Sequence, residues 1–195
     1  MTGTGLVVLA AGGTGGHMFP AEALARALLT RGRRVALMTD SRGEAFGERL
    51  PGVALHRIRA GRLSGNLFRK ALGLVELALG TLEAGRRLRA LGPAAVVGFG
   101  GYPSVPTMLA AARQKLPTVI HEQNAILGRA NRLLASRARR IAISFACRPS
   151  LFASTYSSPS WANSFTSTDS RTFFQGNSSH RFSYCQPFAR DVPTR

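Results

Sequence analysis

Cysteine is scarce in this chain of 195 residues, which contains only Cys147 and Cys185. Small secreted scaffolds held by disulfides need more cysteines, so that class is excluded and a reducing cytoplasm is the expected compartment. Long apolar runs are also missing. No basic residue precedes the first run, Leu6 to Ala11, which is shorter than a signal-peptide core, and no stretch reaches the roughly 20 apolar residues of a spanning helix. We therefore expect no export, and a protein that is soluble or bound at a membrane surface.

Acidic residues are few as well. The chain has 9 Asp and Glu against 26 Lys and Arg, which gives a formal net charge of +17. Such an excess indicates an anionic partner, and composition leaves nucleic acid, an anionic membrane face and a phosphorylated ligand open. Nucleic-acid grooves interleave basic residues with exposed aromatics, whereas Trp161 and the three tyrosines are widely scattered. We therefore expect no nucleic-acid partner.

The chain changes character near Phe145. Up to that point short apolar runs alternate with helical stretches, whereas residues 146–195 are rich in serine and threonine and contain one glycine and no lysine. No long strand or helix can be predicted in the second part. We therefore predict one domain at 1–145 and a tail at 146–195 that is disordered or out of frame, with a divergent flexible extension as the alternative.

The first part predicts an α/β fold. Short apolar strands that alternate with helices form a parallel sheet covered on both faces, so the expected fold class is a Rossmann-like sheet. The predicted strands are 6–10, 35–39, 53–58, 95–99, 118–121 and 141–145. The predicted helices are 20–31, 44–50, 67–91, 104–115 and 128–138. Ligands bind such sheets at the carboxyl ends of the strands, which directs attention to the loops after Ala11, Phe99 and His121.

A glycine-rich loop, Gly12 to Gly16, follows the first strand and leads into a helix. Glycine lets the backbone approach an anion closely, and a helix N-terminus offers free N–H groups, so the loop predicts a phosphate cradle. It lacks the third glycine of the dinucleotide fingerprint, because Met18 stands there, and no Gly-Lys-Ser/Thr of a P-loop follows. A tight turn without a ligand is the alternative.

His17 ends this loop. A histidine beside a helix N-terminus has a lowered pKa and stays neutral near pH 7, which suits a general base. A histidine that only caps the helix or bonds to the loop is nearly as good an interpretation.

Two further loops carry functional groups. The sequence Gly98-Phe99-Gly100-Gly101-Tyr102-Pro103-Ser104 is a second glycine-rich turn, with Ser104 as the expected helix N-cap. The polar run His121-Glu122-Gln123-Asn124 follows the next strand, and Asn131 lies one turn into the helix after it. These groups can bind hydroxyls and amides, and their spacing is not that of metal ligands. The alternatives are a packing aromatic at Tyr102 and an ordinary polar turn.

Three ordered motifs, GGTGGH, GFGGYPS and HEQN, resemble the N-terminal domain of the MurG family over about residues 5–145. The resemblance implies half of a glycosyltransferase-B fold. It also implies transfer of N-acetylglucosamine from UDP-N-acetylglucosamine to the 4-hydroxyl of N-acetylmuramic acid in lipid I, with inversion, to give lipid II for peptidoglycan. Lipid I is the implied partner, and no cofactor and no metal are expected. The tail stands where the family has its donor-binding domain, so the resemblance does not by itself imply activity of this chain alone.

The resemblance also assigns roles to residues. The implied catalytic residues are His17 and Glu122. The implied donor contacts are Thr14, Gly15, Gly16 and Asn124. The implied acceptor contacts are Gly13, Gly100, Gly101, Tyr102 and Asn131, with the two glycine-rich loops at the acceptor's diphosphate.

The segment Leu67 to Leu82 is apolar nearly all round. One interpretation is a helix buried on both sides. The other is a surface that docks on anionic lipid, because cations flank the segment and a lipid-linked acceptor requires membrane contact. The residues assigned to this membrane contact are Leu67, Phe68, Arg69, Lys70 and Leu72. It implies peripheral attachment at the cytoplasmic face of the bacterial inner membrane.

Two other functions remain open. A non-catalytic basic Rossmann-like module could bind phosphorylated ligands or nucleic acid. An unrelated sugar-nucleotide enzyme of the same fold would share the glycine-rich loops without sharing the acceptor.

Overall fold

The chain folds around one parallel sheet of six strands. The computed structural model describes residues 5–144, apart from 13, 44, 46–49, 62–65 and 125, together with the backbone of 174–175 and 181–182. The order in the sheet is β3-β2-β1-β4-β5-β6, and every neighbouring pair is parallel. The strands are β1 (Val7–Ala10), β2 (Val35–Thr39), β3 (Val53–Arg57), β4 (Ala95–Gly98), β5 (Thr118–Glu122) and β6 (Arg140–Ile143).

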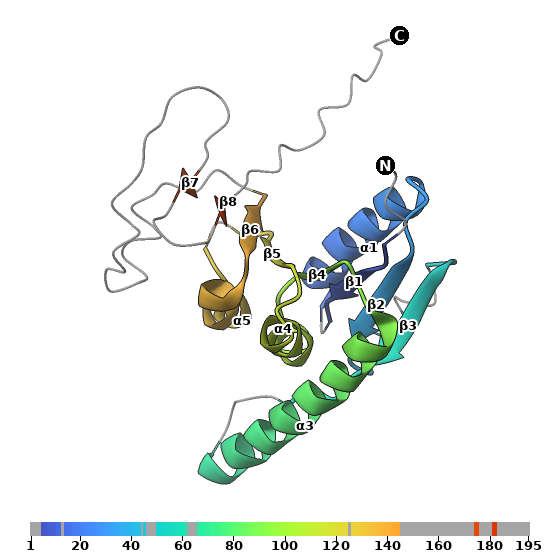
Figure 1. Cartoon of the computed structure of the whole chain (residues 1–195). Helices are drawn as coiled ribbons and strands as arrows, with labels where there is room; N and C mark the ends of the chain where they lie inside the picture. Colours follow the sequence, from blue (N-terminus) through green and yellow to red (C-terminus); the bar gives the residue numbers. More distant parts are fainter. Residues whose placement is uncertain are drawn as a thin grey trace.

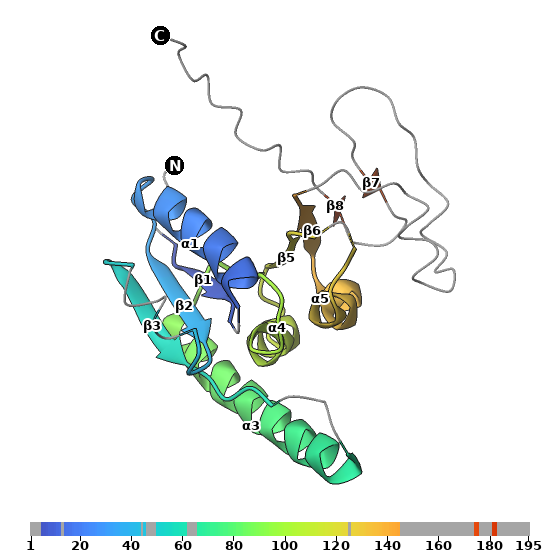
Figure 2. The ribbon, with the colours of Figure 1, turned by 180° about the vertical axis from the view of Figure 1, so that it is seen from behind.

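Helices cover both faces of the sheet, as the alternating pattern predicts. Helix α1 lies on one face, and α3, α4 and α5 lie on the other, as the two opposite views show (Figures 1 and 2). The helices are α1 (Gly15–Leu29), α3 (Leu67–Leu91), α4 (Ser104–Arg113) and α5 (Arg129–Leu134), which continues into the short 3-10 turn η1 (Ala135–Arg137). The predicted fold class is therefore confirmed.

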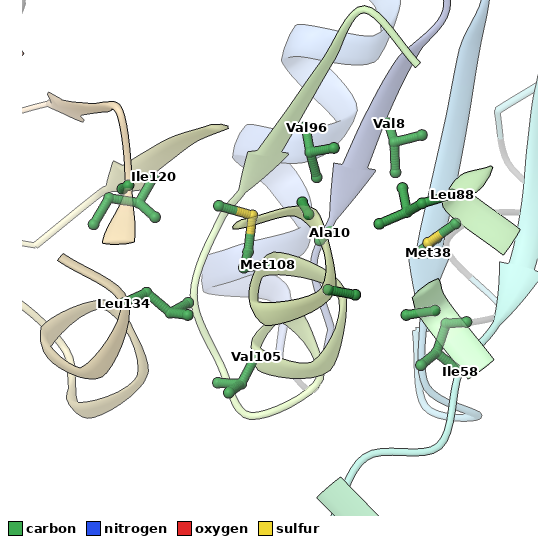
Figure 3. Close-up of a cluster of buried hydrophobic side chains, with 14 of the residues drawn as sticks. Val8, Ala10, Met38, Ile58, Leu88, Val96, Val105, Met108, Ile120 and Leu134 are labelled. Atoms are coloured by element: carbon green, nitrogen blue, oxygen red, sulfur yellow. The ribbon is translucent and has the colours of Figure 1, made fainter. Parts of the chain in front are cut away.

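The core is divided between the two faces because side chains alternate along each strand. Val8 and Ala10 of β1 point to the face of α3 and α4 and join a buried cluster with Met108 and Leu88 (Figure 3). Leu9 points the other way and packs with α1. Strands buried on both faces read as continuous apolar runs, which explains why these runs were visible in the sequence.

The strand order indicates where along the sheet a ligand would bind. From β1 the chain continues to β2 on one side, whereas β4 lies on the other side of β1. Crossovers in opposite directions leave a crevice beyond the carboxyl ends of β1 and β4, where doubly wound sheets bind ligands. The two glycine-rich loops follow these two strands, so the topology brings them together.

The helix and strand bounds predicted from the sequence agree closely with the structure, except at the start of α1. The predicted bounds of β2 and α3 are confirmed, and the other strands differ by one or two residues. Helix α1 begins at Gly15, five residues before the expected Pro20, because the Thr14 carbonyl already accepts the backbone N–H groups of His17 and Met18. Pro20 is an interior residue of this helix, where its missing N–H costs one helical hydrogen bond. Gly15, Gly16 and His17 are therefore the first turn of α1.

Ser104 is also placed differently from the expectation. It is the first helical residue of α4 rather than its N-cap, a position that Pro103 occupies. The buried Ser104 hydroxyl instead donates to the Gly101 carbonyl over 2.9 Å, which ties the helix start to the loop before it.

Most of the predicted tail lies outside the described residues, as does most of the predicted helix at 44–50. The described backbone there forms two short strands, β7 (Phe174–Gln175) and β8 (Arg181–Phe182), which pair antiparallel.

Candidate functional site

A cleft of about 560 Å³ opens at the carboxyl edge of the sheet, where the loops after β1, β4 and β5 meet. The first loop contributes Gly12, Thr14 and His17, and the second contributes residues 100–103. Glu122 at the end of β5, Asn124, and residues 128–131 at the start of α5 close the cleft. We call it the sheet-edge cleft.

His17 is held on the wall of the cleft by its neighbour in the loop. Its Nδ1 forms a hydrogen bond of 2.9 Å with Thr14 Oγ1. Burial lowers the pKa of His17, and the nearby negative charge of Glu122 opposes that shift. The ring is therefore neutral near pH 7. When Nδ1 carries the proton and donates to Thr14, Nε2 keeps a lone pair that can accept a proton.

Glu122 is a buried carboxylate whose two oxygens are occupied by donors. Oε1 accepts hydrogen bonds from the backbone N and the side-chain Nδ2 of Asn124, at 3.0 and 2.8 Å. Oε2 accepts from the backbone N of Gly128 at 2.8 Å and from Asn131 Nδ2 at 2.9 Å. Such a carboxylate fixes the loop between β5 and α5 and orients two amide side chains. This geometry favours a positioning role for Glu122 over that of a proton acceptor.

Asn131 is the second member of this network. Its Nδ2 also donates to the His121 carbonyl at 3.0 Å, whereas its Oδ1 is buried and has no partner among the described residues. Buried acceptors without a partner are rare. Glu122 thus fixes the orientation of the Asn131 side chain, and Asn131 is one of the residues that line the cleft.

The glycines of the second loop let the cleft close tightly. Gly100 and Gly101 have φ angles of +87° and +74°, a region that favours glycine. A Cβ on Gly100 would lie 3.1 Å from His17 Cδ2 and 3.3 Å from Asn131 Nδ2, and one on Gly101 would lie 2.9 Å from the Gly12 carbonyl. These two glycines are explained by close packing against the first loop, without a bound anion.

The structure gathers most of the residues singled out in the sequence. The cleft is lined by both predicted catalytic residues, two of the four predicted donor contacts and four of the five predicted acceptor contacts, namely His17, Glu122, Thr14, Asn124, Gly100, Gly101, Tyr102 and Asn131. Gly15 and Gly16 belong to the first turn of α1 and are not in the lining. Gly13 lies outside the described residues.

His121 points away from the cleft that its neighbour Glu122 lines. Its ring packs against Phe99 with centroids 5.4 Å apart, and its Nε2 lies 3.0 Å from Ser144 Oγ. Burial lowers the pKa of His121 too. Along a strand successive side chains face opposite sides, which separates the two residues.

Sequence reasoning missed two arginines of the cleft, Arg42 and Arg129. Arg42 follows β2 and is held by Asp40, with an N–O distance of 2.8 Å. The sequence signal for Arg42 is its place just after a predicted strand, and the structure adds that β2 lies beside β1, so that its carboxyl end reaches the same edge. Among the described residues, no group of three His, Cys, Asp or Glu side chains could hold a metal ion.

The apolar segment forms an exposed surface on α3. Its buried residues are small or lie in the second half of the helix, and include Gly73, Gly80 and Ala84. Phe68 is 77% exposed and Leu72 is 52% exposed, so the interpretation of a helix buried on both sides is wrong. We call the exposed apolar side chains of this helix the α3 apolar surface. They are Leu67, Phe68, Leu72, Leu74, Val75, Leu79 and Leu82. No helix in the described part of the chain is long and apolar enough to cross a membrane.

Comparison with protein families and curated proteins gives consistent matches. Residues 7–143, which include the whole sheet-edge cleft, match the model described as glycosyltransferase family 28 N-terminal domain. The chain is 63% identical over 139 residues to a protein of Rhodospirillum centenum and 58% identical over 141 residues to one of Rhodospirillum rubrum. Both are named UDP-N-acetylglucosamine--N-acetylmuramyl-(pentapeptide) pyrophosphoryl-undecaprenol N-acetylglucosamine transferase. These matches cover 71% and 72% of this chain but 37% and 36% of the relatives.

Solved structures agree with this fold. MurG of Acinetobacter baumannii superposes with a TM-score of 0.61 at 30% identity, over 72% of this chain and 41% of that one. The Streptomyces glycosyltransferase SsfS6, at 13% identity, superposes with a TM-score of 0.53 over 75% of this chain and 51% of its own. The similarity to SsfS6 shows only that the two proteins share a fold.

Proposed function

The chain belongs to the glycosyltransferase family 28 N-terminal domain family, and from this membership we propose that it forms the acceptor half of an N-acetylglucosaminyltransferase. The reaction would move N-acetylglucosamine from UDP-N-acetylglucosamine to the 4-hydroxyl of N-acetylmuramic acid in lipid I. The observation that carries the proposal is the 63% identity over 139 residues to a relative named for this transfer. The chain spans 37% of the length of that relative.

His17 would act as the general base. A sugar hydroxyl is a weak nucleophile until its proton is removed in the transition state. In our proposal the Nε2 lone pair of His17 takes that proton, while Nδ1 donates to Thr14. The hydroxyl oxygen forms a bond to the anomeric carbon of the donor sugar, the bond to UDP breaks, and the configuration inverts. The lowered pKa of His17 supports this role because it keeps the ring neutral at the working pH.

The other residues of the cleft would hold the two substrates. Asn131, Tyr102 and the second glycine loop would contact the acceptor sugar, since they line the same cleft. Asn124 and Thr14 would contact the donor. Glu122 would position Asn124 and Asn131 through the hydrogen bonds that it accepts. The chain holds no cofactor in this proposal.

Attachment to the membrane would bring the acceptor to this cleft. The α3 apolar surface lies beside Arg69 and Lys70, and cations around an apolar surface favour the anionic face of a bilayer. We propose that the protein docks peripherally on the cytoplasmic face of the inner membrane through this surface.

A fusion protein tests the transfer. Residues 1–144 would replace the matching part of the Rhodospirillum centenum relative, so that the remainder of that protein supplies the donor half. We expect the fusion to transfer labelled N-acetylglucosamine to a short-chain analogue of lipid I. A folded fusion without transfer, beside an active relative, would contradict the proposed function.

His17→Ala in this fusion tests the base. We expect turnover to fall by about 100-fold to 10,000-fold, the usual contribution of a positioned general base, with a far smaller change in acceptor binding. Arg26→Ala is the control, because Arg26 lies on the same helix, is exposed and pairs with Glu22 outside the cleft. Turnover within a few-fold of the parent would make His17 a structural cap.

A further inference from the structure

A second cleft, of about 1060 Å³, lies between α3 and the segments that follow β2 and β3. We call it the arginine cleft, because five of its lining residues are Arg42, Arg57, Arg59, Arg69 and Arg87. Neither the family match nor the names of the relatives assign a role to it.

The charge of the arginine cleft is only partly balanced. Asp40 pairs with Arg42 at 2.8 Å, and Glu83 pairs with Arg87 at 3.2 Å. In the part of the chain that the structure describes, Arg59 and Arg69 form no ion pair with a carboxylate. A third acidic residue, Glu76, also lines the cleft, which leaves an excess of two positive charges among the charged residues of the lining. The guanidinium groups of Arg59 and Arg69 therefore remain for an anionic ligand, and their planar forks match phosphate oxygens.

Close backbone contacts hold the segment after β3 against α3. Gly80 lies directly against the Arg59 carbonyl, and Gly61 lies directly against the Gly73 carbonyl, so a Cβ on Gly80 or Gly61 would overlap these groups. The Arg59 backbone N–H also points to Glu83 Oε2 at 3.5 Å. The segment after β3 is thus seated on the helix, which fixes the place of Arg59 relative to α3.

The arginine cleft joins the two surfaces already described. Arg42 lines both this cleft and the sheet-edge cleft. Leu72 lines this cleft too and belongs to the α3 apolar surface. The arginine cleft therefore adjoins both the polar sheet-edge cleft and the apolar surface.

The name of the relatives gives three groups in the same order: N-acetylmuramyl, pyrophosphoryl and undecaprenol. We infer that the arginine cleft binds the diphosphate of the lipid-linked acceptor, with the sugar in the sheet-edge cleft and the polyprenyl chain toward the α3 apolar surface. This inference rests on the proposed function. It moves the diphosphate away from the glycine-rich loops, where Gly100 and Gly101 are already explained by packing.

Binding of farnesyl diphosphate to the 195-residue protein tests this assignment, since the probe has the diphosphate and a prenyl chain but no sugar. We expect Arg59→Gln and Arg69→Gln each to weaken binding about 5-fold to 10-fold in titration calorimetry at fixed salt. Arg113→Gln, on α4 and outside both clefts, is the matched control and should bind within two-fold of the parent. The Arg59→Lys protein should retain part of the affinity, and farnesyl monophosphate should bind more weakly than the diphosphate.

Three outcomes would overturn the assignment. Unchanged affinity in both arginine variants would place the probe elsewhere, and loss on Gly100→Ala alone would place it at the glycine-rich loops. Equal competition by glycerol 1-phosphate would make the cleft a general site for lipid headgroups. The proposed function fails separately, in the fusion assay for transfer, because probe binding needs neither the acceptor sugar nor the donor half.

Discussion

At the scale of single residues, Gly100 allows the close packing that forms one wall of the sheet-edge cleft, because it has no side chain. Its backbone has φ of +87°, and a Cβ added to it would lie 3.1 Å from the ring of His17 and 3.3 Å from the amide of Asn131. Any larger residue would be strained in backbone and crowded by both functional side chains. The second glycine loop is therefore required for the placement of His17, whatever ligand it contacts.

Gly100→Ala is expected to destabilise the protein by about 2–3 kcal/mol, because left-handed backbone costs an alanine about 1–2 kcal/mol and the new Cβ crowds His17. Gly32→Ala is the matched control, since Gly32 also has positive φ, +67°, but nothing lies within 4 Å of the added Cβ. Its cost should stay at about 1–2 kcal/mol. Urea unfolding of both variants measures the difference, and equal losses would show that the contact with His17 is unimportant.

Burial and hydrogen bonding decide the role of Glu122. Glu122→Gln would turn an amide NH₂ toward groups that are themselves donors, so we expect a loss of about 3 kcal/mol in the free energy of unfolding. Glu22→Gln is the control, because its carboxylate forms only a surface pair with Arg26, worth below about 1 kcal/mol. A stable Glu122→Gln protein would mean that the carboxylate is not needed to hold its loop.

At the scale of elements, α3 combines two halves with different partners. Its second half packs Ala84 and Leu88 into the core, whereas its first half exposes Phe68 and Leu72. Gly73 is the buried residue of the first half, because the segment after β3 lies directly against it. Large apolar residues are thus left on the outer side of the helix.

Vesicle binding tests this surface. We expect binding to anionic vesicles that weakens with salt, since each cation near such a bilayer contributes about 1 kcal/mol and is screened. Phe68→Ser and Leu72→Ser should each lower the binding that remains at high salt about 10-fold, because burying either side chain is worth about 1.5–3 kcal/mol. Leu133→Ser is the control, because Leu133 is an exposed apolar residue on α5, outside the α3 apolar surface, and this variant should change little. Equal sedimentation with neutral and anionic vesicles would refute the electrostatic contribution to membrane binding.

At the scale of the whole molecule, three histidines link stability to pH. Burial lowers the pKa of His17, His56 and His121, and Arg87 adds to the effect at His56. The unfolded chain then binds more protons than the folded one once the pH falls toward 6.5 and below. This contribution to stability is therefore complete above pH 6.5 and is lost on acidification.

We expect the thermal midpoint to fall between pH 7.5 and pH 5.5 at constant ionic strength, in the direction set by these three lowered pKa values. His56→Gln should reduce the slope, because it removes one of the groups without touching the sheet-edge cleft. A midpoint that rises on acidification would show that these rings are easier to protonate in the folded state.

The sequence by itself determined the fold class and the loops that carry function. Continuous apolar runs such as Val35–Thr39 are typical of strands buried on both faces, and glycine-rich turns after strands mark the ligand edge. The start of α1 was misplaced because Pro20 has the local signature of a helix start, whereas the bonds to the Thr14 carbonyl begin the helix earlier. The sequence was sufficient to predict those elements whose structure depends on neighbouring residues in the chain.

Only the tertiary structure decided which groups meet and what each can do. Glu122 and His121 are adjacent in sequence, yet one is surrounded by four donors in the cleft and the other packs on Phe99. Arg42 joins two clefts because β2 lies beside β1, a pairing that a single sequence does not reveal. The exposure of Phe68 likewise depends on what packs against α3. Contacts between distant segments set burial and charge, and these quantities assign the roles.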